Sequence, residues 1–130
     1  MLILFGISVH SFSQVPSYVP TDSLVGWWPF NSNANDLSGN NYHGIVYGAS
    51  LDSDRFGNLN SAYSFDGIDD YIESFPSDSI SYSVGLTIVC WAIIDSHNHN
   101  SNSQFFVSRG FDKTDGHYHL DWNKYQKYFV

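Results

Sequence analysis

The chain has 130 residues, 18% of them aromatic and 42% hydrophobic, which suits one small packed domain and not a disordered segment. Thirteen Asp and Glu against five Lys and Arg give a formal net charge of −8, which argues against binding to nucleic acids or anionic membranes. Gly, Ser, Asn and Asp separate the apolar runs, whereas strong helix formers are scarce. The composition therefore favours an all-β protein.

The first 23 residues are predicted to be an export signal followed by a linker. Residues 1–9 are apolar and too short to span a bilayer, and Ser11 and Ser13 place a cleavage site before Gln14. The usual positively charged start is missing, and a buried N-terminal strand is the alternative. Residues 14–23 are polar and contain prolines, as linkers do. We therefore expect a signal peptide over 1–13, a linker over 14–23 and one domain over 24–130.

The first half of the domain is predicted to contain short strands and polar loops. Residues 24–30 have the pattern of a strand that ends at a proline and an Asn-rich turn. A loop over 31–44 precedes a short strand at Ile45–Tyr47, and a second loop covers 48–60. Ser61–Glu73 then reads as two short strands that pair with each other in a hairpin.

The turn of that hairpin is acidic. Asp66-Gly67 tolerates positive φ and is typical of hairpin turns. Asp69 and Asp70 follow, so two carboxylates stand at the turn exit. Such a unit is either a solvated turn or half of a cation site.

Residues 85–94 form the most strand-like stretch of the chain. The stretch is β-branched and apolar on both faces, so we expect a central strand covered on both sides. Cys90, the single cysteine, lies in it and cannot form an intrachain disulfide; we expect it to be a buried free thiol.

The last strands are predicted at Gln104–Ser108, His117–Trp122 and Lys124–Val130, of which the last two form a closing hairpin. The sequence stops inside an apolar strand, so we expect a domain that is incomplete at its C-terminus. Unpaired sheet edges and an exposed inner face then predict that the isolated chain aggregates or is poorly ordered.

Six segments share their order and spacing with a known family: Leu24–Phe30, Asn33–Gly39, His43–Gly44, Asp54–Asn58, Ser61–Ile72 and Leu86–Ala92. Together they resemble the LamG-like jelly-roll domain of secreted bacterial proteins, which has a concanavalin A-like lectin/glucanase fold. The Phe-Asp-Gly-x-Asp-Asp-Tyr element over 65–71 is the most specific piece, and Cys90 departs slightly from the usual strand pattern. The resemblance covers 24–130, the front part of the family domain.

The resemblance implies an antiparallel jelly-roll sandwich of two sheets, which agrees with the many short strands and Gly/Asn turns. It also implies a module that is usually non-catalytic, that binds carbohydrate or protein ligands, and that often holds a calcium ion. The parent protein would be secreted or at the cell surface, with further domains and no membrane insertion after signal cleavage.

Calcium takes six to eight oxygen ligands, which Asn, Asp and Ser side chains can supply from a tight loop. The candidate ligands are Asp36, Ser38, Asn40 and Asn41, with Asp69 and Asp70 as possible helpers. The alternative is a set of turns in which these side chains bond their own backbone. For the first four residues both interpretations stay open, and for the two acids a structural turn is the stronger one.

Sugars stack on aromatic faces and bond Asn and Asp side chains through their hydroxyls. The candidate aromatic residues are Trp27, Trp28, Tyr42, Tyr47, Trp91 and Trp122, each of which is equally suited to a core. The pairs His97/His99 and His117/His119 have the spacing of a zinc half-site, but solvated histidines explain them better.

Catalysis is not predicted. Retaining glucanases of this fold carry Glu-x-Asp-x-Glu on one strand, whereas this chain has one glutamate, Glu73. Asp69 and Asp70 would point to opposite faces of an extended chain. We expect a non-catalytic module that recognises a glycan or a cell-surface protein with the help of calcium. The alternatives are a structural spacer and an accessory domain of a glycoside hydrolase.

Overall fold

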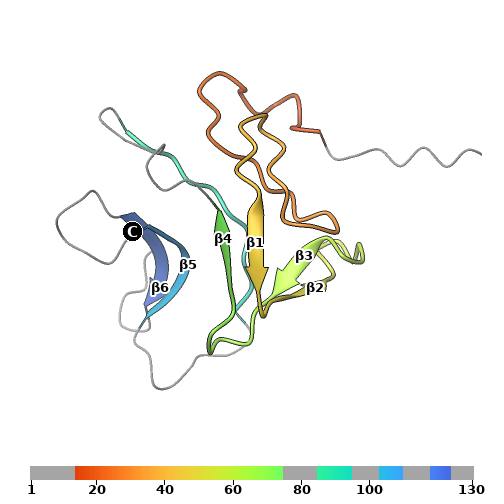
Figure 1. Cartoon of the computed structure of the whole chain (residues 1–130), viewed down its shortest axis with the longest axis vertical. Coiled ribbons are helices and arrows are strands. Elements are labelled where there is room, and N and C mark those ends of the chain that lie inside the picture. Colours follow the sequence, from red (N-terminus) through yellow and green to blue (C-terminus); the bar gives the residue numbers. More distant parts are fainter. Residues whose placement is uncertain (1–13, 75–84, 95–102, 110–117, 124–130) are drawn as a thin grey trace, which may run out of the picture.

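The computed structural model describes residues 14–74, 85–94, 103–109 and 118–123. The strands are β1 (Gly44–Tyr47), β2 (Ser50–Asp52), β3 (Ala62–Ser64), β4 (Tyr71–Ser74), β5 (Ser103–Arg109) and β6 (Tyr118–Asn123). They form three antiparallel two-stranded sheets, β1 with β4, β2 with β3 and β5 with β6 (Figure 1). The described segments contain no helix, so the all-β prediction is confirmed, while the jelly-roll order stays a prediction. None of these segments is a helix long and apolar enough to cross a bilayer.

Some predictions concern other parts of the chain. The signal peptide over 1–13, the pair His97/His99, His117 and the strand Lys124–Val130 lie outside the described residues. His119 and Trp122 are described only as backbone positions of β6.

The sheet of β1 and β4 lies at the centre of the described structure (Figure 1). Its register sets Tyr47 opposite Tyr71 and Val46 opposite Ile72, and it confirms the strand predicted over Ile45–Tyr47. Side chains alternate between the two faces of a strand. The two tyrosines therefore share one face, which is exposed, and Val46 and Ile72 share the other, which is half-buried.

The hairpin predicted over Ser61–Glu73 is wrong in its pairing. Its two runs do form β3 and β4, but β3 pairs with β2, inside the predicted loop 48–60, and β4 pairs with β1. The turn explains the difference. The Asp66 N–H donates to Asp70 Oδ2 at 2.9 Å and the Ile68 N–H donates to Asp66 Oδ1 at 2.8 Å. These side-chain bonds close a wide turn in place of a two-residue one, so the strands separate toward different partners.

The sheet of β5 and β6 matches two predicted strands. Gln104–Ser108 lies within β5, and β6 covers most of His117–Trp122. The ladder shifts register between Phe105 and Val107, as at a β-bulge. The described partner of β6 is β5, whereas its predicted partner was the strand over 124–130.

The predicted first strand, Leu24–Phe30, is not a strand. Its backbone bonds to a loop: the Trp27 N–H donates to the Asp36 carboxylate at 2.9 Å, and the Trp27 carbonyl accepts the Leu37 N–H at 2.8 Å. Phe30 has a φ of 56°, which no strand residue adopts. A buried acidic side chain thus takes the place of a neighbouring strand.

Gly85–Ile94 is also not a strand, and the prediction that it is central and covered is wrong. Val89, Trp91 and Ile93 are 81%, 81% and 79% exposed. Cys90 is exposed as well, which corrects the prediction of a buried thiol. Apolar and β-branched side chains favour an extended backbone, but a strand also needs a hydrogen-bonded neighbour, and none of the described strands is one.

Few side chains are buried. Among the described residues, Ala34 is the only fully buried hydrophobic residue, at 4% exposure. Ala34 also accepts the Gly44 N–H at 2.7 Å, where a Cβ on Gly44 would lie 2.9 Å from the Ala34 Cβ. A second contact joins Phe30 and Tyr63 edge to face, with ring centroids 5.4 Å apart. Packing therefore concentrates where the 24–44 loop meets β1 and β3.

Candidate functional site

Asp36 organises the loop over residues 24–44. Its side chain is 3% exposed, and its carboxylate accepts four hydrogen bonds. Oδ1 accepts the backbone N–H groups of Trp27 at 2.9 Å and Ser38 at 2.8 Å. Oδ2 accepts the Tyr42 N–H at 3.0 Å and the Ser38 hydroxyl at 2.8 Å. A carboxylate has about four lone-pair sites, so the loop itself occupies all of them.

These bonds also set the charge state of Asp36. Burial raises the pKa of its carboxyl, but the hydrogen bonds from Trp27, Ser38 and Tyr42 outweigh burial and hold the pKa below its ordinary value. Hydrogen bonds to the charged form favour that form. Asp36 is therefore a buried anion whose charge is stabilised by hydrogen bonds from three backbone N–H groups and one hydroxyl.

The other predicted ligands of this loop have similar roles. The Asn40 side-chain amide donates to the carbonyls of Leu24 at 2.9 Å and Val25 at 3.0 Å. Asn41 has a φ of 61°, which Asn tolerates better than most residues. A calcium ion bound to Asp36 would have to replace at least one of the hydrogen bonds that close the loop.

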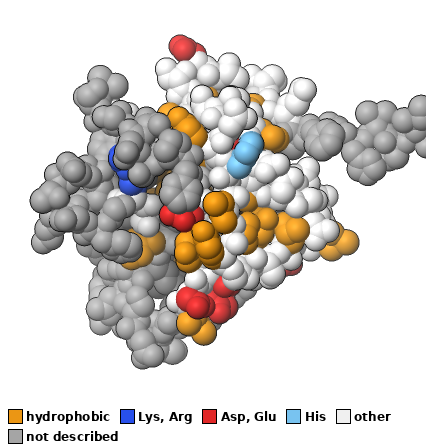
Figure 2. Space-filling model, viewed as in Figure 1, with side chains coloured by type: hydrophobic (Ala, Val, Ile, Leu, Met, Phe, Trp, Pro, Cys, Tyr) orange, Lys and Arg blue, Asp and Glu red, His pale blue; other side chains and the backbone are white. Residues whose placement is uncertain are grey.

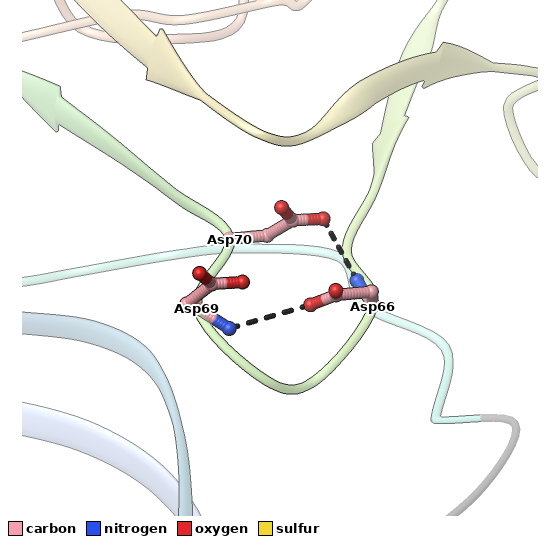
Figure 3. A group of neighbouring side chains, drawn as sticks. All are labelled: Asp66, Asp69 and Asp70. Atoms are coloured by element: carbon pink, nitrogen blue, oxygen red, sulfur yellow. Dashed lines mark hydrogen bonds between the residues drawn. The ribbon is translucent and has the colours of Figure 1, made fainter.

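A different acidic cluster lies in the turn between β3 and β4. Asp66, Asp69 and Asp70 can each present an oxygen within 4.8 Å of the others (Figure 3). Asp66 and Asp69 are exposed, and Asp70 is half-buried. We call these three residues the acidic turn. Asp69 and Asp70 were predicted as helper ligands; Asp66 was assigned only to the turn, although Asp-Gly-x-Asp-Asp already shows a third acid.

Among the described residues, Asp36 does not belong to the group of carboxylates that the acidic turn brings within 4.8 Å of one another. The Asp36 loop reaches β1 at Gly44, its first residue. The Asp70 carboxylate instead contacts Gly48, directly after the last residue of β1. Four residues of strand span about 13 Å, whereas calcium–oxygen distances are about 2.3–2.6 Å. The six predicted ligands therefore fall into two separate groups.

An exposed aromatic pair adjoins the acidic turn. Tyr47 and Tyr71 stack across β1 and β4, with ring centroids 4.5 Å apart and an interplanar angle of 17°. They are 40% and 50% exposed. Tyr71 follows Asp70 in the chain, and Tyr47 precedes the Gly48 that Asp70 contacts. The acidic turn therefore lies next to the tyrosine pair at this end of the β1–β4 sheet.

Figure 2 shows apolar side chains gathered over β1 and β4, with acidic side chains beside them. Between residues 44 and 71, the exposed large apolar residues include Ile45, Tyr47, Leu51, Phe65 and Tyr71. An exposed apolar patch with a polar rim is typical of a surface that binds a ligand or a partner.

The remaining aromatic candidates divide between core and surface. The Trp28 Nε1 donates to the Tyr42 carbonyl at 2.8 Å, which fixes both residues in the 24–44 loop. The Trp27 Nε1 is buried and has no acceptor among the described residues. Trp91 is exposed, and the Arg55 guanidinium lies 3.9 Å from the centroid of its ring and 4.6 Å from that of Phe56.

A third polar feature is the loop Asp54–Asn58, which the sequence placed correctly in a loop but to whose acid it assigned no role. Asp54 Oδ1 accepts the N–H groups of Phe56 and Asn58, each at 2.9 Å, and Oδ2 accepts the Asn58 side-chain amide at 2.9 Å. The Asn58 bonds are the main reason that the pKa of Asp54 is lowered. The available signal was Asp followed by Gly and Asn at positions three and four, which is typical of a self-bonded turn.

Comparisons with models of known families, with curated proteins and with solved structures each found no match to this chain. The relation to LamG-like domains therefore stays a prediction from the sequence.

Proposed function

We propose that this chain is a non-catalytic module that recognises a glycan on the surface made by the Tyr47–Tyr71 pair and the acidic turn. The proposal includes export to the cell surface or medium, as part of a longer protein. One observation carries it: three carboxylates within 4.8 Å of one another adjoin an exposed aromatic stack. Aromatic faces bind the CH groups of sugar rings, and carboxylates accept their hydroxyls.

Calcium would assist at the acidic turn. Three carboxylates supply three to six of the six to eight oxygens that the ion takes, so sugar hydroxyls or water could complete the shell. Asp66, Asp69 and Asp70 are the ligands that this proposal names. Clustered like charges in one turn repel each other, and a divalent cation relieves that repulsion.

We propose a non-catalytic role because Asp36, Asp54 and the acidic turn do not have the arrangement of a glycosidase carboxyl pair. Glycosidases hold two carboxyl groups about 5–9 Å apart on either side of a bond to be cleaved. Here Asp36 and Asp54 hold backbone amides of their own loops. The acidic turn crowds its three carboxylates at one exposed position.

A glycan array with the purified chain, in calcium and in EDTA, tests the proposal. The variants Asp69→Asn and Tyr71→Ala remove one cation ligand and one stacking face. Asp22→Asn, which changes an exposed acid outside the acidic turn, is the matched charge control. We expect binding that falls about tenfold or more in Tyr71→Ala, falls in EDTA and in Asp69→Asn, and is unchanged in Asp22→Asn. If glycan binding is unchanged in both Tyr71→Ala and Asp69→Asn, the glycan does not bind at the tyrosine pair and the acidic turn.

A second candidate function is adhesion to a protein partner. The exposed row Val89, Trp91 and Ile93 favours it, because apolar residues that alternate along an extended segment can add to the sheet of a partner. The array separates the two: an adhesion or spacer domain would bind no glycan.

A further inference from the structure

A hollow of about 400 Å³ lies away from the acidic turn. It is lined by Pro29, Asn31, Asp54, Asn58 and Ser61. These residues come from the end of the 24–30 segment, the Asp54–Asn58 loop and the residue before β3. The volume falls within the range of about 300–1,000 Å³ that small-ligand sites have. We call this the β3 pocket.

The walls of the β3 pocket are fixed by backbone hydrogen bonds. Ser32 N–H donates to the Asn60 carbonyl at 2.7 Å and Ser61 N–H donates to the Asp52 carbonyl at 2.9 Å. Asp54 N–H donates to the Asn58 carbonyl at 3.0 Å. A pocket whose walls are already ordered binds with a smaller entropy cost than one that must form around its ligand.

The polar groups on these walls include both donors and acceptors. Three hydrogen bonds fill three of about four acceptor sites on Asp54, so one site on Oδ2 is available within the described structure. The side-chain amides of Asn31 and Asn58 each contain a donor and an acceptor group, and the Ser61 hydroxyl, which donates to the Leu59 carbonyl at 3.3 Å, can still accept. A wall that contains both donors and acceptors suits sugar hydroxyl groups, each of which both donates and accepts.

Charge narrows the ligand class. Among the described lining residues, Asp54 is the one with an ionisable side chain. Its pKa is lowered, mainly by the Asn58 hydrogen bonds and least by the neighbouring Arg55, so the described wall of the β3 pocket carries a negative charge that disfavours anions. A single carboxylate is a poor ligand set for a divalent cation, in contrast to the three of the acidic turn. Pro29 adds an apolar surface for CH groups. A neutral polyhydroxylated ring fits all of these features.

We propose that the β3 pocket binds one neutral sugar residue, independently of calcium. The inference deepens the proposed glycan recognition and rests on it for the ligand class. Ser61 precedes β3 and Asp66 lies two residues after it, so the five residues of chain between Ser61 and Asp66 span at most about 17 Å. One oligosaccharide can reach both places, with a terminal residue in the pocket and an inner residue on the tyrosines.

The test is saturation-transfer NMR with glucose, galactose, mannose and N-acetylglucosamine, in EDTA, which needs only a low protein concentration. Asn31→Ala removes an exposed side chain of the pocket wall, and Asn35→Ala removes an exposed asparagine outside it. We expect saturation of at least one neutral sugar, roughly three- to tenfold weaker binding in Asn31→Ala, and wild-type binding in Asn35→Ala and Asp69→Asn.

Two results would overturn the β3 pocket as a sugar site: no transfer to any of the four sugars, or equal affinity in Asn31→Ala and wild type. Preferential binding of an anionic sugar such as sialic acid would overturn the charge argument. Failure of the larger surface is distinguishable, because it removes the effects of EDTA, Asp69→Asn and Tyr71→Ala on the array but leaves the monosaccharide signal intact.

Discussion

Replacement of Asp36 by alanine should unfold the 24–44 loop and with it much of the domain. The variant leaves the N–H groups of Trp27, Ser38 and Tyr42 without the acceptor that each has now. A hydrogen bond to a charged group contributes about 1.5–3 kcal/mol, but bonds to one carboxylate are not additive. We expect a loss of about 3–5 kcal/mol, a large share of the roughly 5–15 kcal/mol of a typical domain.

Urea unfolding, followed by tryptophan fluorescence at low protein concentration, measures this loss. Trp27 and Trp28 lie in the loop and report on it directly. Asp36→Asn is the informative second variant, because its amide keeps an acceptor for Trp27 and Ser38 but turns a donor toward the Tyr42 N–H. It should cost less than alanine but more than 1 kcal/mol. If the free energy of unfolding of Asp36→Ala is within about 0.5 kcal/mol of that of the wild type, the range of ordinary surface changes, then Asp36 does not organise the 24–44 loop.

The same carboxylate predicts how stability depends on pH. The folded-state pKa of Asp36 is lowered, so its contribution is present above the unfolded pKa of about 3.9 and is lost as the pH falls through the folded value. Wild-type stability should therefore decrease below about pH 4, and the decrease should be shallower in Asp36→Asn. Equal slopes in the two proteins would show that other carboxyls carry the acid sensitivity.

Three further outcomes follow from single contacts and exposures. Trp28→Phe loses the hydrogen bond from the indole N–H to a backbone carbonyl, whereas the indole N–H of Trp27 has no acceptor among the described residues. Trp28→Phe should therefore lower the free energy of unfolding by about 1–2 kcal/mol more than Trp27→Phe. Similar losses in the two variants would contradict this. Cys90 should react fully with maleimide in the native chain but slowly near neutral pH, since desolvation raises its thiol pKa; a thiol that reacts only in urea would contradict the exposure. The double substitution Val89→Ser and Ile93→Ser should reduce the self-association that sedimentation measures. No change would show that these exposed apolar residues do not cause it.

The sequence was sufficient to predict some of the strands, but not all of them and not their pairing. The runs at Ile45–Tyr47 and Gln104–Ser108 are strands because β-branched and aromatic residues favour extended backbone. The hairpin over Ser61–Glu73 failed because its turn residues bond each other's side chains, which a dipeptide rule cannot anticipate. The strand predicted over Gly85–Ile94 failed for another reason. Apolar side chains on both faces predict a covered strand, but cover requires other segments to pack and pair with it, and most of this stretch is exposed in the structure.

The candidate sites were only partly predictable for a physical reason. Asp36 and Asp69 are the same residue type in loops of similar composition, and the sequence left the role of each open. The structure separates them by burial and by the number of donors. Asp36 is buried and accepts four hydrogen bonds, whereas Asp69 is exposed and accepts none from the described residues. A carboxylate that is already saturated stabilises its loop, and one that is unsaturated and exposed is available to a ligand.

This contrast makes a prediction that involves both residues. Asp69→Asn should change the free energy of unfolding, measured in urea, by no more than the roughly 0.5 kcal/mol of an ordinary surface substitution. It should nevertheless weaken calcium binding, measured by titration calorimetry. Asp36→Asn should do the reverse: it should lower stability and leave the calcium affinity of the folded fraction unchanged, because Asp36 is not one of the carboxylates grouped in the acidic turn. If Asp36→Asn weakens calcium binding and Asp69→Asn does not, the ion binds in the 24–44 loop, and the hydrogen bonds around Asp36 must open to admit it.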